Sequence, residues 1–213
     1  MRTKTLLLTA VLSAAGLASS LSLAQGAVYS VNAVGYVNLP LPVGLSLICN
    51  PLKGSTGNDL NTILPLTDAD VGATIYTYNG SAFVSTTYLG TSIGWTPNNS
   101  VAPGQGMFIS LGAAKTLTFV GEVPQGTDSN IHMNNGLSLV APPVPQSSAL
   151  DTMLFPADVG DTVYFYRGGS YASSTFLGPG IGWTPAAVPG VGEGFWVSRA
   201  NAADWNRNFS VNN

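Results

Sequence analysis

The chain has 213 residues, only 8% of them charged, and its formal net charge is −3. Soluble domains usually carry about 25% charged residues, so we expect Ser, Thr, Asn and Gly to supply the polar surface. The sequence contains no cluster of Lys and Arg, which argues against nucleic acids and anionic membranes as partners. One histidine and one cysteine leave little material for a His-based triad or a Cys/His metal site.

The N-terminus has the pattern of a secretory signal peptide: two basic residues, a short apolar run over residues 5–18, and small residues at a cleavage site. We predict that residues 1–24 are removed and that the mature chain starts at Gln25, with Ala27 as a less well-matched alternative. The run is too short for a membrane span, and no later stretch is long and apolar enough, so no span is expected in the mature chain. The expected location is extracellular or at the cell surface.

The mature chain reads as short strands separated by Gly, Pro and Asn. Residues 74–78 alternate, so that successive side chains face opposite sides of the strand, and Asn79-Gly80 then indicates a hairpin. Strands are predicted over residues 34–37, 45–49, 74–78, 81–88, 107–111 and 116–123. A single helical turn is predicted over residues 60–64 and over the matching residues 150–154.

Much of this pattern occurs twice. Residues 69–110 align without a gap to residues 157–198, and 20 of the 42 positions are identical. Gly-Leu-Ser-Leu at residues 44–47 returns at residues 136–139. The chain is therefore interpreted as a tandem duplication.

We predict an all-β fold: a tandem duplication of a β-sandwich or partly closed barrel unit that contains only one-turn helices. The signal peptide occupies residues 1–24, the first β repeat with its N-terminal strand residues 25–123, and the second β repeat residues 124–213. The two units either pack side by side around a pseudo-two-fold axis or share one continuous sheet through residues 116–123.

The pentapeptide Ile-Gly-Trp-Thr-Pro occurs once in each copy and places Trp95 and Trp183 between residues that favour turns. In the favoured interpretation each Trp is buried and plugs the end of its β unit, with the indole N–H bonded to a loop carbonyl. In the alternative the rings are exposed and form platforms for carbohydrate together with four Tyr residues of the predicted hairpins: Tyr76, Tyr78, Tyr164 and Tyr166.

The motif Gly-x-Gly occurs at residues 104–106 and again at residues 192–194. Each copy leads into a predicted strand, whereas a dinucleotide-binding loop must lead into a helix. We therefore interpret both as turns or bulges with unusual backbone angles.

No catalytic residue and no cofactor is predicted. Asp68 and Asp70 are a weak candidate for a calcium site, but no Glu follows at the EF-hand distance and a solvated turn is preferred. Cys49 is expected to be a small apolar residue of a strand, with a reactive thiol as the minor alternative, and His132 a surface loop residue. Carboxylate-pair chemistry stays open for three acidic residues, should they converge: Asp158, Asp161 and Glu193.

Three similar segments stand at the ends of the repeats: residues 34–37, 116–123 and 208–211. Because three such segments serve two repeats, we expect one strand to be left over. The N-terminal strand either pairs with the C-terminal region and closes the molecule, or a terminal strand adds to a neighbouring subunit by β-augmentation. The residues assigned to this assembly strand are Val34, Gly35, Tyr36, Val37, Phe209 and Val211.

Several motifs together resemble a known group of proteins. They are Ser-Val-Asn-Ala-Val-Gly-Tyr-Val after the signal, Gly-Leu-Ser-Leu-Ile-Cys-Asn-Pro-Leu, Gly-Trp-Thr-Pro and the closing Trp-Asn-Arg-Asn-Phe-Ser-Val-Asn. They are similar to motifs of uncharacterised secreted β-rich repeat proteins of verrucomicrobial and planctomycete-type bacteria. The likeness covers nearly all of the mature chain and implies an exported, duplicated β protein. No activity is established for the group, so it implies no site residue.

The leading functional interpretation is a secreted, non-enzymatic structural or cell-surface protein that assembles with itself through terminal strands. The alternative is an extracellular carbohydrate-binding module that uses the Trp and Tyr platforms. The expected partners are accordingly further copies of the same chain or an extracellular polysaccharide.

Overall fold

The structure, a computed structural model, describes residues 33–211, and these residues belong to one compact unit of the chain. The predicted signal peptide and the proposed mature start lie outside the described residues. Strands dominate the described part, and its helices are single turns of three or four residues.

The first repeat contains seven strands and two helical turns. In chain order they are β1 (Val34–Leu41), β2 (Gly44–Cys49), α1 (Leu60–Ile63), η1 (Asp68–Asp70), β3 (Thr74–Tyr78), β4 (Phe83–Tyr88), β5 (Trp95–Thr96), β6 (Gly106–Leu111) and β7 (Lys115–Glu122). The second repeat has the turn η2 (Thr127–Ser129) and seven strands. They are β8 (Asn130–Met133), β9 (Gly136–Val140), β10 (Thr162–Arg167), β11 (Ser170–Phe176), β12 (Trp183–Thr184), β13 (Phe195–Arg199) and β14 (Ala203–Asn206).

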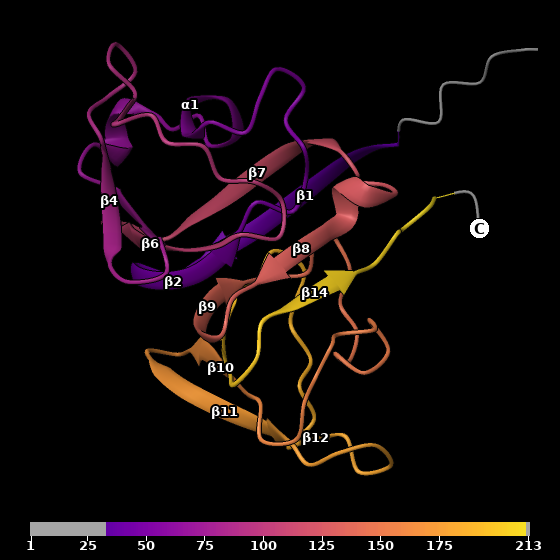
Figure 1. The fold of residues 1–213 in the computed structure, drawn as a ribbon. Coiled ribbons are helices and arrows are strands. Elements are labelled where there is room, and N and C mark those ends of the chain that lie inside the picture. The colour runs from indigo at the N-terminus through magenta and orange to yellow at the C-terminus, as the bar shows by residue number, and fades with distance from the viewer. Residues whose placement is uncertain (1–32, 212–213) are drawn as a thin grey trace, which may run out of the picture. The chain divides into compact units, whose positions relative to one another are not determined.

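Both repeats arrange their strands in the same way. Each has an antiparallel five-stranded sheet, in the order β2-β6-β3-β4-β5 in the first repeat and β9-β13-β10-β11-β12 in the second. Each also has a two-stranded ribbon, β1 with β7 and β8 with β14 (Figure 1). The predicted all-β tandem duplication is confirmed, and the paired sheets are those of tandem β-sandwich units.

Strand alternation sorts the side chains into two separate repeat cores. Ile75 and Met107 point into the first core, where the ribbon contributes Phe119 and Leu117. Val163 and Phe195 are their counterparts in the second core, closed by Trp205 of β14. Each sheet therefore buries one face within its own repeat, as the alternation of residues 74–78 predicts.

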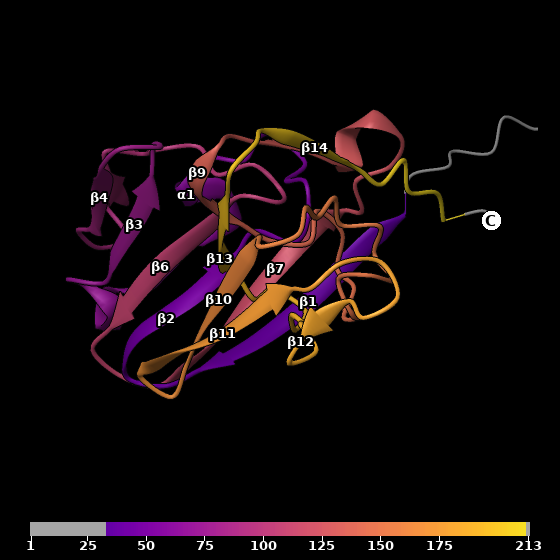
Figure 2. The same ribbon diagram turned by 60° about the horizontal axis from the view of Figure 1, so that its bottom comes forward.

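The other faces of the two sheets meet each other (Figure 2). The contacts between them are reciprocal: the rings of Tyr78 and Trp196 lie 4.9 Å apart, and those of the equivalent residues Phe108 and Tyr166 lie 5.6 Å apart. Contacts that recur with the partners exchanged are the mark of a two-fold relation. The repeats thus pack around a pseudo-two-fold axis, and the alternative of one continuous sheet is wrong.

The Gly-x-Gly motif forms the backbone joint between the repeats. Cys49 N donates to Gly192 O, and the equivalent Ala141 N donates to Gly104 O, both at 2.9 Å. These first glycines have positive φ, as expected of a turn. The second position of each motif needs a glycine for a different reason, which is close packing between the repeats. A Cβ at Gly194 would lie 2.7 Å from Ile48 O in the other repeat.

The prediction that three terminal strands serve two repeats, with one strand left over, is wrong. Four strands are present, and they form two ribbons, one for each repeat. β1 pairs with β7 from Val34↔Glu122 to Leu41↔Lys115, so the N-terminal strand does not pair with the C-terminal region. The strand that precedes β9 is β8, and the strand that ends the second repeat is β14.

The likeness of residues 34–37 to residues 120–123 has a local cause. Gly35 and Gly121 are directly paired. A Cβ at Gly35 would lie 2.6 Å from Leu52 Cδ2, and one at Gly121 would lie 2.3 Å from Lys53 O. Both strands need a glycine at this crossing, so the shared Val-Gly pair reflects packing within one repeat rather than equivalence between repeats.

The helical turn is retained in only one copy. In α1 the side chain of Asp59 caps the turn by accepting a hydrogen bond from Thr62 N. The corresponding residues 150–154 form an irregular turn in which Leu154 has φ of 55°. The prediction of a helical turn therefore holds for residues 60–64 and is wrong for the second copy.

Acid should destabilise the fold through three carboxylates of the first repeat. Hydrogen bonds lower the pKa of Asp59 (from Asn98, then Thr62) and of Asp68 (from Thr91). Burial raises the pKa of Asp70, but the bonds from Lys115 and Thr67 outweigh it and lower it overall.

Because these folded-state pKa values lie below those of the unfolded chain, the unfolded chain binds more protons in acid. The urea midpoint is expected to stay level from pH 7 to about 5 and to fall as the pH drops below about 4. Asp59→Asn should remove part of this acid sensitivity. An acid dependence of the midpoint that is identical in the variant and the wild type would contradict the assignment.

Candidate functional site

The two Trp residues of the repeated pentapeptide are structural. Trp95 and Trp183 are 2% and 4% exposed, and each lies in a two-residue edge strand of its sheet. Trp95 Nε1 donates to Leu64 O at 2.9 Å, which is the loop carbonyl that the favoured interpretation requires. The assignment of Trp95 and Trp183 as carbohydrate platforms is wrong, because buried rings offer no face to a sugar.

The four predicted Tyr platforms lie between the sheets. Tyr76, Tyr78, Tyr164 and Tyr166 are partly buried against the cluster that joins the repeats. Tyr78 and Tyr166 contact aromatic rings of the opposite repeat. Tyr76 and Tyr164 line two open grooves, and Tyr166 and Tyr78 border two others, so each of the four reaches a groove.

These two grooves, here called the aromatic grooves, are related by the pseudo-two-fold axis. Their volumes are about 460 and 450 Å³, and Phe83 and Tyr171 line both of them. The first is otherwise lined by Leu45, Tyr76, Phe108 and Ser110, and the second by Leu137, Tyr164, Trp196 and Ser198. Among the residues that the structure describes, no charged side chain lines either groove.

Phe83 and Tyr171 are the most accessible rings of the aromatic grooves, at 51% and 55% exposed. Neither was among the predicted site residues. The register of the two hairpins could have identified them. Phe83 pairs with Tyr78 across β3 and β4, and Tyr171 pairs with Tyr166 across β10 and β11. Directly paired residues share a face of the sheet.

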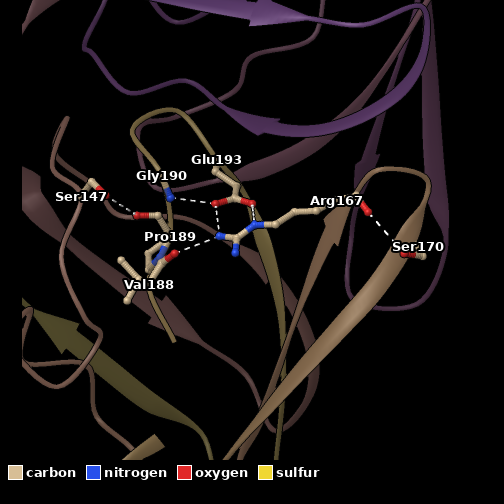
Figure 3. A network of polar contacts seen from close by, with 7 residues as sticks. All are labelled: Ser147, Arg167, Ser170, Val188, Pro189, Gly190 and Glu193. Atoms are coloured by element: carbon tan, nitrogen blue, oxygen red, sulfur yellow. Dashed lines mark hydrogen bonds and ion pairs between the residues drawn. The ribbon is translucent and has the colours of Figure 1, made fainter. Parts of the chain in front are cut away.

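A larger groove of about 610 Å³ lies between β1 and β2 of the first repeat and the loops beside β10 and β13 of the second. At one side, the guanidinium of Arg167 makes two parallel 2.6 Å hydrogen bonds to the carboxylate of Glu193 (Figure 3). Arg167 also donates to Val188 O at 2.8 Å, and Gly190 N donates to Glu193 at 2.7 Å. The Arg167–Glu193 pair therefore fixes the loop over residues 188–192, whose Gly192 O accepts a hydrogen bond from β2.

The equivalent groove in the other half is smaller, about 230 Å³, and has uncharged amide side chains at the two positions of the Arg167–Glu193 pair. Asn79 stands at the position of Arg167, and Gln105 at the position of Glu193. His132 lines this smaller groove and is an exposed residue of the strand β8 rather than of a loop. Its Nδ1 is 2.6 Å from Asp204 Oδ1, across the ribbon from it.

The acidic residues do not form one site. Asp158 and Asp161 both approach the buried Arg199, whose guanidinium is 3.2 Å from Asp161 Oδ2. Glu193 is bound to Arg167 instead. Asp158 and Asp161 therefore lie close together, but Glu193 does not join them, and the three carboxylates do not converge on one site.

The weak calcium candidates are held by other groups. Asp68 accepts hydrogen bonds from Thr91 N and Oγ1, and Asp70 accepts from Thr67 and from Lys115 Nζ at 2.7 Å. Within residues 33–211, no three His, Cys, Asp or Glu side chains gather closely enough to hold a metal ion. The turn interpretation thus accounts for both carboxylates.

Cys49 ends β2 and is buried, as expected. Burial, and secondarily the negative charge of Glu193, raise the pKa of its thiol to about 12. The thiol stays protonated at neutral pH, and since the thiolate is the nucleophile, the reactive-thiol alternative has no support here.

The outer edge of β1 is the remaining candidate surface. Val123 N donates to Ala33 O, while Glu122, the partner of Val34, exchanges hydrogen bonds with Lys53 on its far side. Antiparallel ladders alternate such pairs, so the peptide groups of Val34, Tyr36 and Asn38 point away from β7. Within residues 33–211, β7 is the one strand paired with β1.

Three exposed apolar side chains lie beside this edge, on a face that also carries polar residues of β1 and β7. Val34, Tyr36 and Val120 are 73%, 65% and 59% exposed and share the outer face of the ribbon. The corresponding ribbon of the second repeat exposes His132 and Asp204 instead.

The two C-terminal residues of the predicted assembly strand lie elsewhere. Phe209 pairs with Gly126 and donates through its N–H to Ser129 Oγ, and Val211 N donates to Gln125 Oε1. These contacts tie residues 209–211 to the second repeat of the same chain.

No helix within residues 33–211 has the length and apolar character needed to cross a membrane. Comparison with family models, with curated proteins and with solved structures yields no match to this chain.

Proposed function

We propose that the protein is an exported, non-enzymatic structural or cell-surface protein that associates with other copies of itself through the outer edge of β1. The observation that carries the proposal is the edge strand β1, with its outward peptide groups and the exposed apolar side chains of Val34, Tyr36 and Val120 beside them. A long, apolar edge strand is a template for pairing with another chain.

Three further features support this function. Pro40 lies on the same outward-facing register as Val34 and Tyr36, a position where a missing N–H disturbs no bond to β7. It limits the pairing edge to the stretch before it. The low content of charged residues suits a surface that packs against copies of itself, and the predicted signal peptide suits export.

The test compares two substitutions at one position. Tyr36→Pro removes an outward N–H without removing a bond to β7, whereas Tyr36→Thr keeps that N–H and removes only the ring. Light scattering on the exported wild type is expected to show a mass that grows with concentration. The Tyr36→Pro variant should be monomeric, and self-association of the Tyr36→Thr variant should be at most partly weakened.

A wild type that stays monomeric at every concentration would remove the basis of the proposal. Equal weakening by both substitutions would mean that the ring, rather than the strand edge, makes the contact. Circular dichroism and thermal unfolding of both variants establish that the fold is retained.

The second candidate function, binding of a neutral polysaccharide, rests on the aromatic grooves. Exposed Phe83 and Tyr171 offer ring faces on which sugars can stack, and Ser110 and Ser198 add hydroxyl groups beside them. The described residues that line these grooves carry no charge, which favours a neutral ligand. The open form of the grooves favours a chain over a small molecule.

The test is sedimentation with insoluble neutral polysaccharides such as cellulose and chitin. The double variant Phe83→Ala and Tyr171→Ala should lose retention at least tenfold, while Tyr36→Thr, which removes an exposed ring elsewhere, should bind like the wild type. Equal retention of both variants would exclude the aromatic grooves as the binding surface.

A further inference from the structure

The sequence immediately before β1 repeats the sequence of β1. Residues 27–32 read Ala-Val-Tyr-Ser-Val-Asn and residues 33–38 read Ala-Val-Gly-Tyr-Val-Asn, with four of six positions identical. Alternate residues of an extended strand share a face. The first hexapeptide therefore has the composition and alternation of an edge strand of this same ribbon.

The two hexapeptides are not interchangeable against β7. Gly35 occupies the third position of the second hexapeptide, and a Cβ there would meet Leu52 Cδ2 at 2.6 Å. The first hexapeptide has Tyr29 at that position. A tyrosine does not fit where a Cβ already collides, so residues 33–38 take the place beside β7 and residues 27–32 are left to pair elsewhere.

The same hexapeptide is poorly suited to fold back along its own β1. Ala33 O accepts a hydrogen bond from Val123 N, so the peptide groups of Ala33 face β7 and cannot close a hairpin on the outer edge of β1. The first residue with outward peptide groups is Val34, so a two-residue hairpin would have Asn32 and Ala33 as its turn residues. The bond of Ala33 to Val123 opposes such a turn, because it holds Ala33 in the ladder. A strand from another molecule meets no such restriction.

We propose that residues 27–32 of one copy add as a third strand to the outer edge of β1 in the next copy. This inference rests on the proposed self-association and names its partner strand. The outward N–H groups of Val34, Tyr36 and Asn38 lie along five residues, about 13 Å at 3.3 Å per residue, which the six residues of the hexapeptide are long enough to cover. Pro40 then ends the available edge.

The contact joins two different surfaces, the segment of one copy and the edge of the next. Such heterologous contacts do not close on a two-fold axis and extend into open chains unless the rotation closes a ring. The assembly is therefore expected to be head-to-tail, with β1 of one terminal copy unfilled.

The experiment uses the exported chain with residues 27–32 replaced by an equal length of alternating Gly and Ser. This replacement variant should be monomeric in light scattering. A fluorescent peptide of residues 25–32 should bind to it saturably, as measured by anisotropy. Adding Tyr36→Pro to the same variant should lower its affinity for the peptide at least tenfold, whereas adding Tyr36→Thr should leave peptide binding in place.

The outcomes separate this inference from the proposed function. If the replacement variant assembles like the wild type while Tyr36→Pro in the otherwise unchanged chain is monomeric, then β1 pairs with another β1 and the partner strand is wrong. If both variants assemble like the wild type, the edge of β1 is not the contact and both proposals fail. A peptide with proline at the positions of Val28 and Val31 serves as the matched non-binding control.

Discussion

Trp95→Ala is expected to lower the free energy of unfolding by about 3–5 kcal/mol, the range for removing a buried large aromatic side chain. Trp95 packs in the first core against Tyr88, with ring centroids 5.4 Å apart, and its indole N–H satisfies Leu64 O. Trp183→Ala should have a similar effect in the second core. Urea unfolding followed by circular dichroism measures both.

Substitution by phenylalanine separates packing from hydrogen bonding. Trp95→Phe leaves the Leu64 carbonyl without its donor, whereas Trp183 Nε1 is buried with no partner among the described residues. Trp95→Phe should therefore cost about 1 kcal/mol more than Trp183→Phe. Tyr171→Ala, which removes an exposed ring, is the control and should change stability little. An intact, fully stable Trp95→Ala protein would refute the structural role.

The second large effect is expected at the joint between the repeats. Gly194→Ala should lower the free energy of unfolding by about 1–3 kcal/mol, the usual cost of overpacking. The new Cβ would lie 2.7 Å from Ile48 O, a backbone atom that cannot rotate away as a side chain can. Because Ile48 belongs to the other repeat, the loss should be seen in the unfolding of both.

The matched control is Gly112→Ala, since nothing lies within 4 Å of a Cβ built at Gly112 and its φ is not positive. It should stay within about 0.5 kcal/mol of the wild type. Two separate unfolding transitions, with only one of them shifted in Gly194→Ala, would show that the repeats are not coupled through this joint.

Strand positions and the duplication were predictable because both have local signatures. Alternation in residues 74–78 assigned Ile75 to one face and Tyr76 to the other, and the structure places them in the repeat core and between the sheets. The duplication was visible from the gapless alignment of the two copies, without a structure. The repeated Trp was ambiguous, since the same turn chemistry suits a buried and an exposed ring.

The candidate surfaces were less predictable, because they are made by residues far apart in sequence. Phe83 and Tyr171 line the same two grooves although they lie in different repeats. The loop bound by Arg167 and Glu193 meets β2 across the joint. Pattern analysis sees one strand at a time and does not reveal which faces will meet.

The sequence by itself determined that this is a β-rich duplicated chain, because alternation, turn residues and repetition all act over a few neighbouring positions. The tertiary structure alone decided the pairing of β1 with β7 and the reason for the second glycine of each Gly-x-Gly. It also decided which aromatic rings stay accessible. These features depend on backbone approach and packing between distant segments, which are collective properties of the folded chain and leave no local pattern in the sequence.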